Sequence, residues 1–577
     1  MGKRKPSDTK DSKLGQNELQ ESGTMVVKKN RKNHRQRKRP LQIYKRVPNE
    51  IWLAIFDYVT AQRDLLHFLT VCKRFYALGR PTLYRTIFFT PITFGALRRI
   101  QTTLETLPND SPLLLVAQGM VVGGLAEFMP RRESVNPYAC VGPIIAKSFS
   151  ARMTSLVFVG VTLLSTIHHV LSNLPNLQRL HFYSSYIEAG ANTAWLEDRR
   201  RRSKKLAILP QLRELRLWRN EWYKTTPQPL TILEQRVPTA PCGYMRTLMS
   251  LLHICQKMHT LYIDWNAAVP RILCWIFQNN PVTLRYLCLR MPPTEAQVQN
   301  TGFSASLLPT VLSCFPQLEE FRVIGNVHIA GNRTWHGAPP PLRIYTGPHT
   351  VISAFEDIPA LERVTFTHHP GAILPRVDTL SDVFSRMSSA SLQELNVYVH
   401  CWDEELIYCI RYCFPQLKVL RLSYADGHVN EDGMAPFAAE HMVCLRNLEI
   451  FHLCYLILPP HSSQGVLYHP RGTQGCTLRD FHAYLRGALS CPTLSESPVR
   501  WSMSDEETKE LLVAWNKYVP HLREVRFTAN GIWRRHMQSD GQWGVWKMYD
   551  ELSVQKDLLV YNDSLEVWKE FESLRQQ

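Results

Sequence analysis

One short phrase recurs along this 577-residue chain and limits the folds open to it. It consists of an apolar residue, a proline, any residue and a leucine, with apolar residues three and five positions after that leucine, as in FPQLKVLRL at residues 414–422. Copies with the proline have their first leucine at Leu177, Leu212, Leu318, Leu361, Leu417 and Leu522, and weaker copies have their first anchor at Met153, Met258, Leu284, Leu392 and Leu445. The alternating apolar residues that end each copy are typical of a half-buried β-strand.

The spacing of the eleven copies predicts a repeat architecture. Successive anchors lie 24 to 46 residues apart, except for a last interval of 77 residues. Segments between copies, such as residues 245–254 and 404–413, carry apolar residues at helical spacing. A strand–helix unit of this size cannot bury its own faces, but stacked units share one continuous core. We therefore predict an α/β solenoid with a curved parallel sheet over residues 151–577. The alternative is an irregular α/β domain in which leucine is merely common.

A second pattern, at residues 41–88, predicts three short helices. Pro48 and Glu50 suit a helix start, and Ile51 and Ile55 share one face of that helix. The third helix is expected to end at Gly79 and Pro81. Three helices in about 40 residues make a small core, so part of this apolar surface is expected to need a partner.

These helices resemble an F-box. The resemblance rests on VPNEIWLAIFDYV at 47–59, DLLHFLTVCKRFY at 64–76 and LYR at 83–85. It implies docking onto the Skp-family adaptor of a cullin-RING ubiquitin ligase. By the family pattern, the adaptor-facing or supporting apolar contacts come from Val47, Pro48, Ile51, Ile55, Leu65, Leu69, Val71 and Cys72. The plainer interpretation is a three-helix start to a larger domain.

The repeat half resembles the leucine-rich-repeat F-box proteins, and above all their divergent, irregular fungal kind. The resemblance covers period and anchors only, since the usual Asn or Cys after each strand is mostly missing. It implies the fold class α/β, with an N-terminal three-helix F-box followed by an irregular leucine-rich-repeat solenoid. Residues 89–150 form a connecting segment in this division of the chain, and a helix over 553–574 caps the array.

The positive charge of the chain is concentrated in its first 40 residues. They hold thirteen Lys and Arg against four Asp and Glu, which is +9 of the formal net charge of +17. Their low apolar content predicts disorder. A nuclear localisation signal is predicted at Lys28, Lys29, Arg31, Lys32, Arg35, Arg37, Lys38 and Arg39. The other interpretation is a solvated tail without a receptor, so the expected location is the nucleus or the cytoplasm, with an import receptor as a further partner in the first case.

Catalytic and cofactor patterns are missing from the sequence. It contains no HExxH, GxSxG, GxxxxGK[ST] or GxGxxG. The glycine cluster at residues 119–124 predicts a turn, and Cys409 and Cys413 are interpreted as structural thiols. The charged N-terminus and the fourteen scattered cysteines favour a reducing compartment, without a signal peptide or membrane span. We therefore expect no enzyme activity, metal or cofactor.

Aromatic residues close to the repeat strands are candidates for contacts with a target protein. Those predicted to rim the solenoid surface are Trp218, Tyr223, Trp265 and Tyr424. The basic run at residues 199–205 lies between two copies, where it is either a solvated loop or a grip for an acidic target.

Together with what the F-box resemblance implies, these patterns predict a non-enzymatic subunit that selects an unknown target protein for ubiquitination and binds no membrane. Two alternatives remain: a repeat scaffold outside ubiquitination, and a nucleic-acid-associated adaptor that uses the basic tail.

Overall fold

The fold is described from a computed structural model. The residues that it describes are 47–58, 62–89, 116–123, 152–159, 162–163, 174–183, 186–188, 209–218, 221–223, 257–265, 269–279, 283–291, 308–325, 340–352, 358–367, 374–387, 391–427, 431–455, 503–527, 531–538 and 541–550, with a few single residues between these ranges. The chain divides into two compact units, Met1–Trp52 and Leu53–Gln577. The first unit contributes residues 47–52 to this description and is treated by itself.

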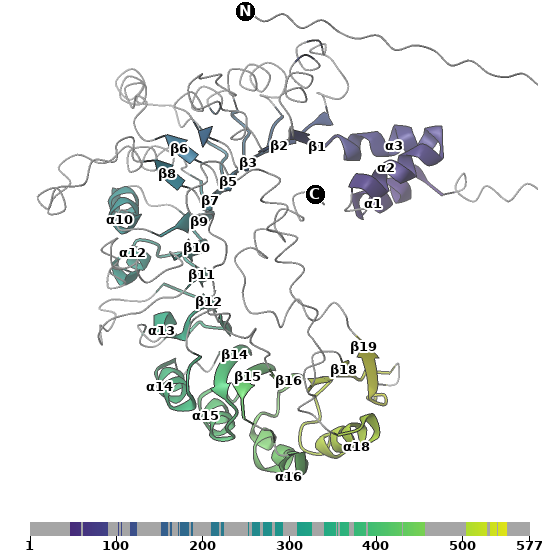
Figure 1. Ribbon diagram of the computed structural model, residues 1–577, viewed down its shortest axis with the longest axis vertical. Helices are drawn as coiled ribbons and strands as arrows, with labels where there is room; N and C mark the ends of the chain where they lie inside the picture. The colour runs from purple at the N-terminus through teal and green to yellow at the C-terminus, as the bar shows by residue number, and fades with distance from the viewer. Residues whose placement is uncertain are drawn as a thin grey trace, which may run out of the picture. The chain divides into compact units, whose positions relative to one another are not determined.

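One sheet of sixteen strands organises the second unit (Figure 1). Its order is β1-β2-β3-β5-β7-β9-β10-β11-β12-β13-β14-β15-β16-β17-β18-β19. Every pair up to β17 is parallel, whereas β17–β18 and β18–β19 are antiparallel. Because neighbours in the sheet also follow one another along the chain, the sheet grows by one strand per repeat, as in a solenoid. The predicted fold class is confirmed.

The strands are short and regularly placed. Their bounds are β1 (Thr86–Phe89), β2 (Gly119–Gly123), β3 (Ser155–Val159), β5 (Arg179–Tyr183), β7 (Glu214–Trp218), β9 (Thr260–Asp264), β10 (Tyr286–Arg290), β11 (Glu320–Ile324), β12 (Ile344–Gly347), β13 (Arg363–Phe366), β14 (Glu394–Cys401), β15 (Val419–Asp426), β16 (Ile450–Tyr455), β17 (Glu524–Arg526), β18 (Gly531–Arg534) and β19 (Lys547–Asp550). A second parallel sheet contains β4 (Thr162–Leu163), β6 (Tyr186–Glu188) and β8 (Glu221–Tyr223).

The recurring phrase is a β-turn that feeds a strand. In the copy before β15, the N–H of Leu417 donates to the carbonyl oxygen of Phe414 at 3.2 Å, with Pro415 between them. Proline suits this second position of a turn because its fixed φ matches the turn geometry. The strand then begins two residues after the leucine, at Val419. The same turn bond joins Leu361 to Ile358 before β13.

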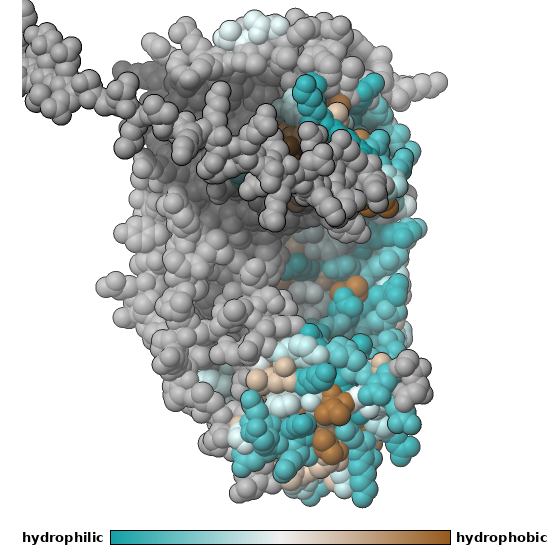
Figure 2. Space-filling model, turned by 90° about the vertical axis from the view of Figure 1, so that its right-hand side faces the viewer, coloured by the Kyte–Doolittle hydropathy of each residue, from teal (hydrophilic) through white to brown (hydrophobic). Residues whose placement is uncertain are grey.

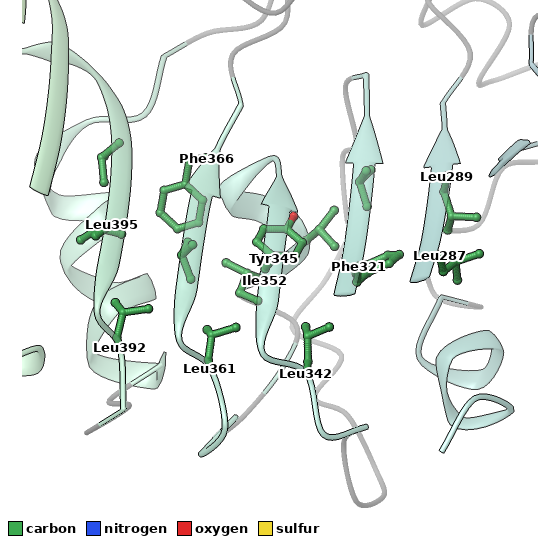
Figure 3. Packing of buried hydrophobic residues seen from close by; sticks show 14 of the residues in the cluster. Leu287, Leu289, Phe321, Leu342, Tyr345, Ile352, Leu361, Phe366, Leu392 and Leu395 are labelled. Carbon is green, nitrogen blue, oxygen red and sulfur yellow. The ribbon is translucent and has the colours of Figure 1, made fainter. Parts of the chain in front are cut away.

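The anchors of successive repeats form the core. Leu342, Leu361 and Leu392 lie in a row beside the starts of β12, β13 and β14 (Figure 3), and all three are buried. Helices cover the other side of this core: the rings of Phe366 on β13 and Phe384 on α14 (Val377–Met387) stack 6.2 Å apart. Each repeat therefore contributes one layer to a shared core, as the periodicity predicts.

The helices lie on the outer side of the curved sheet (Figure 1). Those of the repeat region are α10 (Val269–Asn279), α12 (Leu308–Ser313), α13 (His349–Ile352), α14, α15 (Glu405–Cys413), α16 (Glu431–Glu440), the 3-10 helix η5 (Met442–Cys444) and α18 (Asp505–Trp515). Packed helices need about 8–10 Å between their axes, whereas strands need only about 4.8 Å. A layer of helices paired with a layer of strands must therefore curve with the helices outside.

The structure adds one repeat that the sequence pattern missed and corrects two expectations. A strand, β12, follows Leu342 and fills the 43-residue interval between Leu318 and Leu361. The copy before β16 is anchored at Leu448 rather than Leu445, because the N–H of Leu448 closes the turn onto the carbonyl oxygen of Leu445. The glycine cluster expected to form a turn contains β2 (Gly119–Gly123), so the sheet already includes part of the predicted connecting segment.

Three helices precede the sheet: α1 (Asn49–Tyr58), α2 (Gln62–Val71) and α3 (Lys73–Leu83). They match the predicted three-helix pattern, but α3 does not end at Gly79 and Pro81. Gly79 is buried within α3 because the side chains of Leu69 and Phe56 occupy the space of a Cβ atom. The basic tail, the run at 199–205 and the helix predicted over 553–574 lie outside the described residues.

Candidate functional site

The three N-terminal helices of the chain share a core of few residues. Phe56, Leu65, Leu69 and Phe75 are buried. The ring of Phe56 meets that of Phe75 edge to face, 5.6 Å away. Between α2 and α3, the Cys72 Sγ atom accepts the N–H of Phe75 at 3.4 Å and caps α3. This contact fixes the start of α3, which only Cys72 separates from the end of α2.

The same helices expose an unusual amount of apolar surface. Of the fourteen large hydrophobic side chains that are exposed among the described residues, seven lie within residues 51–76. In the second unit they are Leu53, Ile55, Leu66, Phe68, Val71 and Tyr76. Val71 is 65% exposed and Leu66 52% exposed. We call these six side chains the apolar surface of the module. Exposed apolar residues at this density mark an interaction site.

The first unit adds the opening turn of α1. Pro48 is exposed and Ile51 is 51% exposed. The N–H of Trp52 donates to the carbonyl oxygen of Pro48 at 3.4 Å, so Pro48 lies at the helix start, as predicted. Ile51 and Ile55 are four residues apart on one helix and share a face of it.

The residues predicted to serve the adaptor fall into two groups. Pro48, Ile51, Ile55 and Val71 are exposed and available to a partner. Leu65 and Leu69 are buried and support the module from within, while Val47 and the capping Cys72 are half-buried.

Four exposed apolar residues were not among the predicted adaptor contacts: Leu53, Leu66, Phe68 and Tyr76. The sequence alone does not show whether an apolar helix residue is buried in the module or exposed on its surface. The structure of the chain without its partner distinguishes the two cases.

The module passes directly into the sheet. Only Tyr84 and Arg85 separate α3 from β1. The carbonyl oxygen of Arg85 accepts the N–H groups of Gln118 and Gly119 at 2.8 and 3.0 Å, and its Nε donates to the Gln118 side chain at 3.2 Å. These bonds attach the end of α3 to the strand that follows β1 in the sheet.

A second candidate surface is the sheet face opposite the buried anchors. Between the two core residues of each strand lies one residue whose side chain points to the other face, where His181, Cys288, His452 and Arg526 are also buried. These residues are in register across eleven strands and form what we call the middle row: His181, Arg216, Tyr262, Cys288, Arg322, Thr346, Thr365, Asn396, Arg421, His452 and Arg526. The row contains four arginines and no carboxylate.

Carboxylates lie next to the middle row, two residues before the row residue on the same strand. Glu394 lies 2.5 Å from Arg421 and 2.6 Å from Arg363. Glu524 lies 2.9 Å from His452 and 2.8 Å from Arg534. The charges of these two clusters are therefore balanced locally, which restrains the side chains within them.

Near the N-terminal end of the row, the Oε1 atom of Glu214 on β7 lies 3.1 Å from the Nε2 atom of His181 on β5. Burial lowers the pKa of His181 to about 4, so its ring is neutral at pH 7. Burial alone would raise the pKa of Glu214, but the close approach of His181 and the charge of Arg216 outweigh it and bring this pKa to about 2. Glu214 is thus a carboxylate held between the side chains of His181 and Arg216.

Aromatic residues flank the same cluster. The guanidinium of Arg216 lies 4.0 Å from the ring centroid of Tyr262, and the rings of Tyr262 and Tyr286 lie 4.9 Å apart. Both tyrosines are half-buried. Tyrosine and arginine are the residue types that most often dominate binding energies at protein interfaces. This group on β7, β9 and β10 is the strongest candidate for target contact on the sheet.

The predicted target contacts are placed differently. Trp265 is 3% exposed and Tyr424 is 4% exposed, and both belong to the hydrophobic core. The expectation that they rim the surface is therefore wrong: Trp265 follows β9 directly and Tyr424 lies within β15, where its ring packs 6.1 Å from that of Trp402. The side chains of Trp218 and Tyr223 lie outside the described part of the chain.

A separate apolar patch lies at the C-terminal end of the sheet. Figure 2 shows hydrophobic atoms gathered among hydrophilic ones at its lower end, where β18, β19 and α18 lie in Figure 1. The exposed large hydrophobic residues of the segment that holds β18 and β19, residues 531–550, are Met537, Val545, Met548 and Tyr549. Among the described strands, β19 has a hydrogen-bonded neighbour on one side only.

The described residues hold no group of three or more His, Cys, Asp and Glu side chains that could bind a metal ion. Cys409 and Cys413 are free and half-buried on α15. None of the helices in the described ranges has the length and apolar character needed to cross a membrane.

Comparison with known families identifies residues 45–90 as an F-box-like domain. Its described part contains α1, α2 and α3 together with β1. No curated protein matches the sequence of the whole chain.

Several solved structures show weak similarity to the chain. One from the Rad7–Elc1 complex in yeast aligns with a TM-score of 0.30 at 12% identity, covering 72% of this chain and 89% of that one. The TLR13–ssRNA13 complex gives a TM-score of 0.29 at 14% identity, covering 61% and 48%. The plant peptide hormone receptor RGFR1 in complex with RGF2 gives 0.21 at 10% identity, covering 59% and 44%.

Proposed function

We propose that this chain is the substrate-recognition subunit of a ubiquitin ligase of the Skp–cullin–F-box type. Its F-box-like domain docks a Skp-family adaptor, and its repeat domain binds a target protein. The chain itself carries out no bond chemistry. It raises the effective concentration of the target beside the ubiquitin-charged enzyme held elsewhere in the assembly.

The apolar surface of the module is the observation that carries this proposal. Four buried side chains hold the module together, while six in the second unit, and Ile51 in the first, stay exposed. Covering a surface of this composition with a partner lowers the free energy, because apolar side chains leave water. The position of these residues in an F-box-like domain supports an adaptor as that partner.

The target is proposed to bind the sheet face that carries the middle row. Tyr262 and Tyr286, beside Arg216, supply half-buried aromatic surface that is held in place by neighbouring ion pairs. Side chains fixed before binding lose little conformational entropy when a partner arrives. This assignment replaces Trp265 and Tyr424, which are buried in the core.

Co-purification with a Skp-family adaptor tests the docking role. The variant is Ile55→Asp/Val71→Asp in the intact chain, because both side chains are exposed and their loss leaves the module core untouched. Val513→Asp/Tyr412→Asp is the matched control, since Val513 and Tyr412 are exposed apolar residues of the repeat helices α18 and α15. We expect the parent and the control to retain the adaptor and the first variant to lose it by tenfold or more.

Each alternative predicts a different result. If the folded parent retains no adaptor, the ligase role is refuted and a repeat scaffold takes its place. If binding to nucleic acid falls steeply with salt and disappears on deletion of residues 1–40, the basic tail defines a nucleic-acid-associated adaptor.

A further inference from the structure

Two thiols from consecutive repeats meet on the helical side of the sheet. Cys274 lies in α10, between β9 and β10, and Cys314 directly follows α12, between β10 and β11. Both Sγ atoms point at the carbonyl oxygen of Thr310, at 3.8 Å from Cys274 and 3.3 Å from Cys314. Both thiols therefore converge on the same acceptor atom. The chain thus brings together two cysteines separated by 39 residues.

Packing around the pair holds the two segments in contact. The ring of Phe277 in α10 meets that of Phe315, the residue after Cys314, at 4.9 Å between centroids. Both phenylalanines are buried. Both cysteines are half-buried and pack against the edge of this core.

The contact changes how readily the pair ionises. The hydrogen bond from Cys274 stabilises a thiolate at Cys314 and lowers the pKa of Cys314, while the pKa of Cys274 is raised by the same hydrogen bond and by burial. The Ser313 side chain also acts in favour of the Cys314 thiolate. A thiolate with a second thiol beside it is the arrangement found in redox-sensitive cysteines.

We propose that Cys274 and Cys314 form a peroxide-sensitive pair that closes to a disulfide between α10 and the end of α12. The Cys314 thiolate attacks one oxygen of a hydroperoxide, whose O–O bond breaks to leave a sulfenic acid and, after protonation, water or an alcohol. The Cys274 sulfur then attacks the sulfenic sulfur, and the S–S bond forms as the S–O bond breaks and water leaves. The two thiols lose two hydrogen atoms, and their two electrons reduce the peroxide.

Other described cysteines lack this combination. Cys288 and Cys454 are buried within strands, and burial raises the pKa of Cys454 to about 12. Cys409 and Cys413 are one turn apart on α15, and burial raises the pKa of Cys413. Since the thiolate is the reactive form, Cys413 and Cys454 are expected to react more slowly than Cys314.

The disulfide would join two successive repeats. α10 and α12 flank β10, whose Tyr286 contacts Tyr262 on β9. The cross-link would restrain the relative movement of these repeats, and it forms or opens independently of adaptor docking, so the proposal stands whether or not the chain serves a ligase.

The test treats the full-length reduced protein with increasing hydrogen peroxide, blocks the remaining thiols with an alkylating reagent and maps the peptides by mass spectrometry. We expect a cross-linked peptide pair containing Cys274 and Cys314, lighter than the two reduced peptides by two hydrogen atoms and restored by a thiol reductant. It should form at a lower dose than any oxidation of Cys409 or Cys413.

Variants assign the two roles. Cys274→Ser should leave a sulfenic acid at Cys314, which a cyclic diketone traps, whereas Cys314→Ser should leave Cys274 reduced at the same dose. Cys409→Ser/Cys413→Ser is the matched control and should leave the cross-link unchanged. Alkylation of Cys274 and Cys314 as separate thiols, at doses that oxidise the exposed Cys401, would overturn the proposal.

Discussion

Gly79 and Leu69 provide a direct test of how the F-box-like module is packed. A Cβ atom added to Gly79 would lie 2.4 Å from Leu69 Cδ2 and 3.2 Å from Phe56 Cδ2. All three residues are buried. The leucine therefore fills the space that a larger residue on α3 would need, and the two positions should be energetically coupled.

The structure sets the expected magnitudes. Leu69→Ala should destabilise the module by about 3–5 kcal/mol, the upper part of the usual range, because Gly79 has no side chain to fill the cavity. Gly79→Ala gains about 1 kcal/mol of helix propensity but should cost about 1–3 kcal/mol by overpacking. In the Leu69→Ala background the clash is gone, so Gly79→Ala should instead stabilise by about 1–2 kcal/mol through helix propensity and a buried methyl group. The coupling is then about 2 kcal/mol.

Hydrogen exchange of α3 amides in the intact chain measures this coupling, because it reports the free energy of local opening. A coupling of about 2 kcal/mol changes the relative exchange rates by about thirtyfold. Tyr76→Ala, at an exposed position of α3, is the control and should have equal effects in both backgrounds. Equal effects of Gly79→Ala in both backgrounds would show that Leu69 does not occupy this space.

Three further predictions concern pH, location and backbone strain. The pKa of buried His181 is about 4 in the folded protein and about 6.5 in the unfolded protein, so between these pH values the unfolded state binds one more proton. The free energy of unfolding should therefore fall by up to about 3 kcal/mol as the pH drops from 6.5 to 4. A His181→Gln variant whose free energy of unfolding, measured by denaturant titration, has the same dependence on pH would contradict this. Residues 1–40, fused to a fluorescent protein too large to diffuse, should carry it into the nucleus, and retention in the cytoplasm would refute the localisation signal. Gly427→Ala should lower the melting temperature more than Gly541→Ala. Both glycines have positive φ, but a Cβ atom at Gly427 would lie 3.0 Å from Cys401 Sγ, whereas one at Gly541 would have no described atom within 4 Å. Equal losses of melting temperature would argue against the contact at Gly427.

Sequence reasoning located the repeats well where the turn chemistry was explicit. Each copy with a proline is followed by a strand that begins two residues after its leucine, as at Leu361 and Arg363. The copy at Leu342 was missed because Gly347 stands where the last apolar residue is expected. There a Cβ would lie 2.6 Å from the Tyr345 hydroxyl group, so the glycine makes room for a buried tyrosine.

The functional surfaces were harder to predict, because exposure depends on contacts between segments far apart in the sequence. Tyr424 and Tyr262 both belong to repeat strands, yet the first is buried in the core and the second lies in the middle row of the opposite face. One residue of offset within a strand decides which face a side chain occupies. The pairing of Cys274 with Cys314 had no local signal, since it arises only when α10 and α12 come together.

Under the proposed function, the repeat register would also determine how far a bound target lies from the start of the sheet. Neighbouring strands are about 4.8 Å apart, so the five steps from β1 to β9 place Tyr262 about 24 Å along the sheet from the strand that follows α3. Insertions between repeats lengthen the chain without changing this spacing, because the strands remain adjacent. A bridging subunit of the proposed kind could therefore tolerate insertions of different lengths between repeats and still hold its target at a distance set by the number of strands.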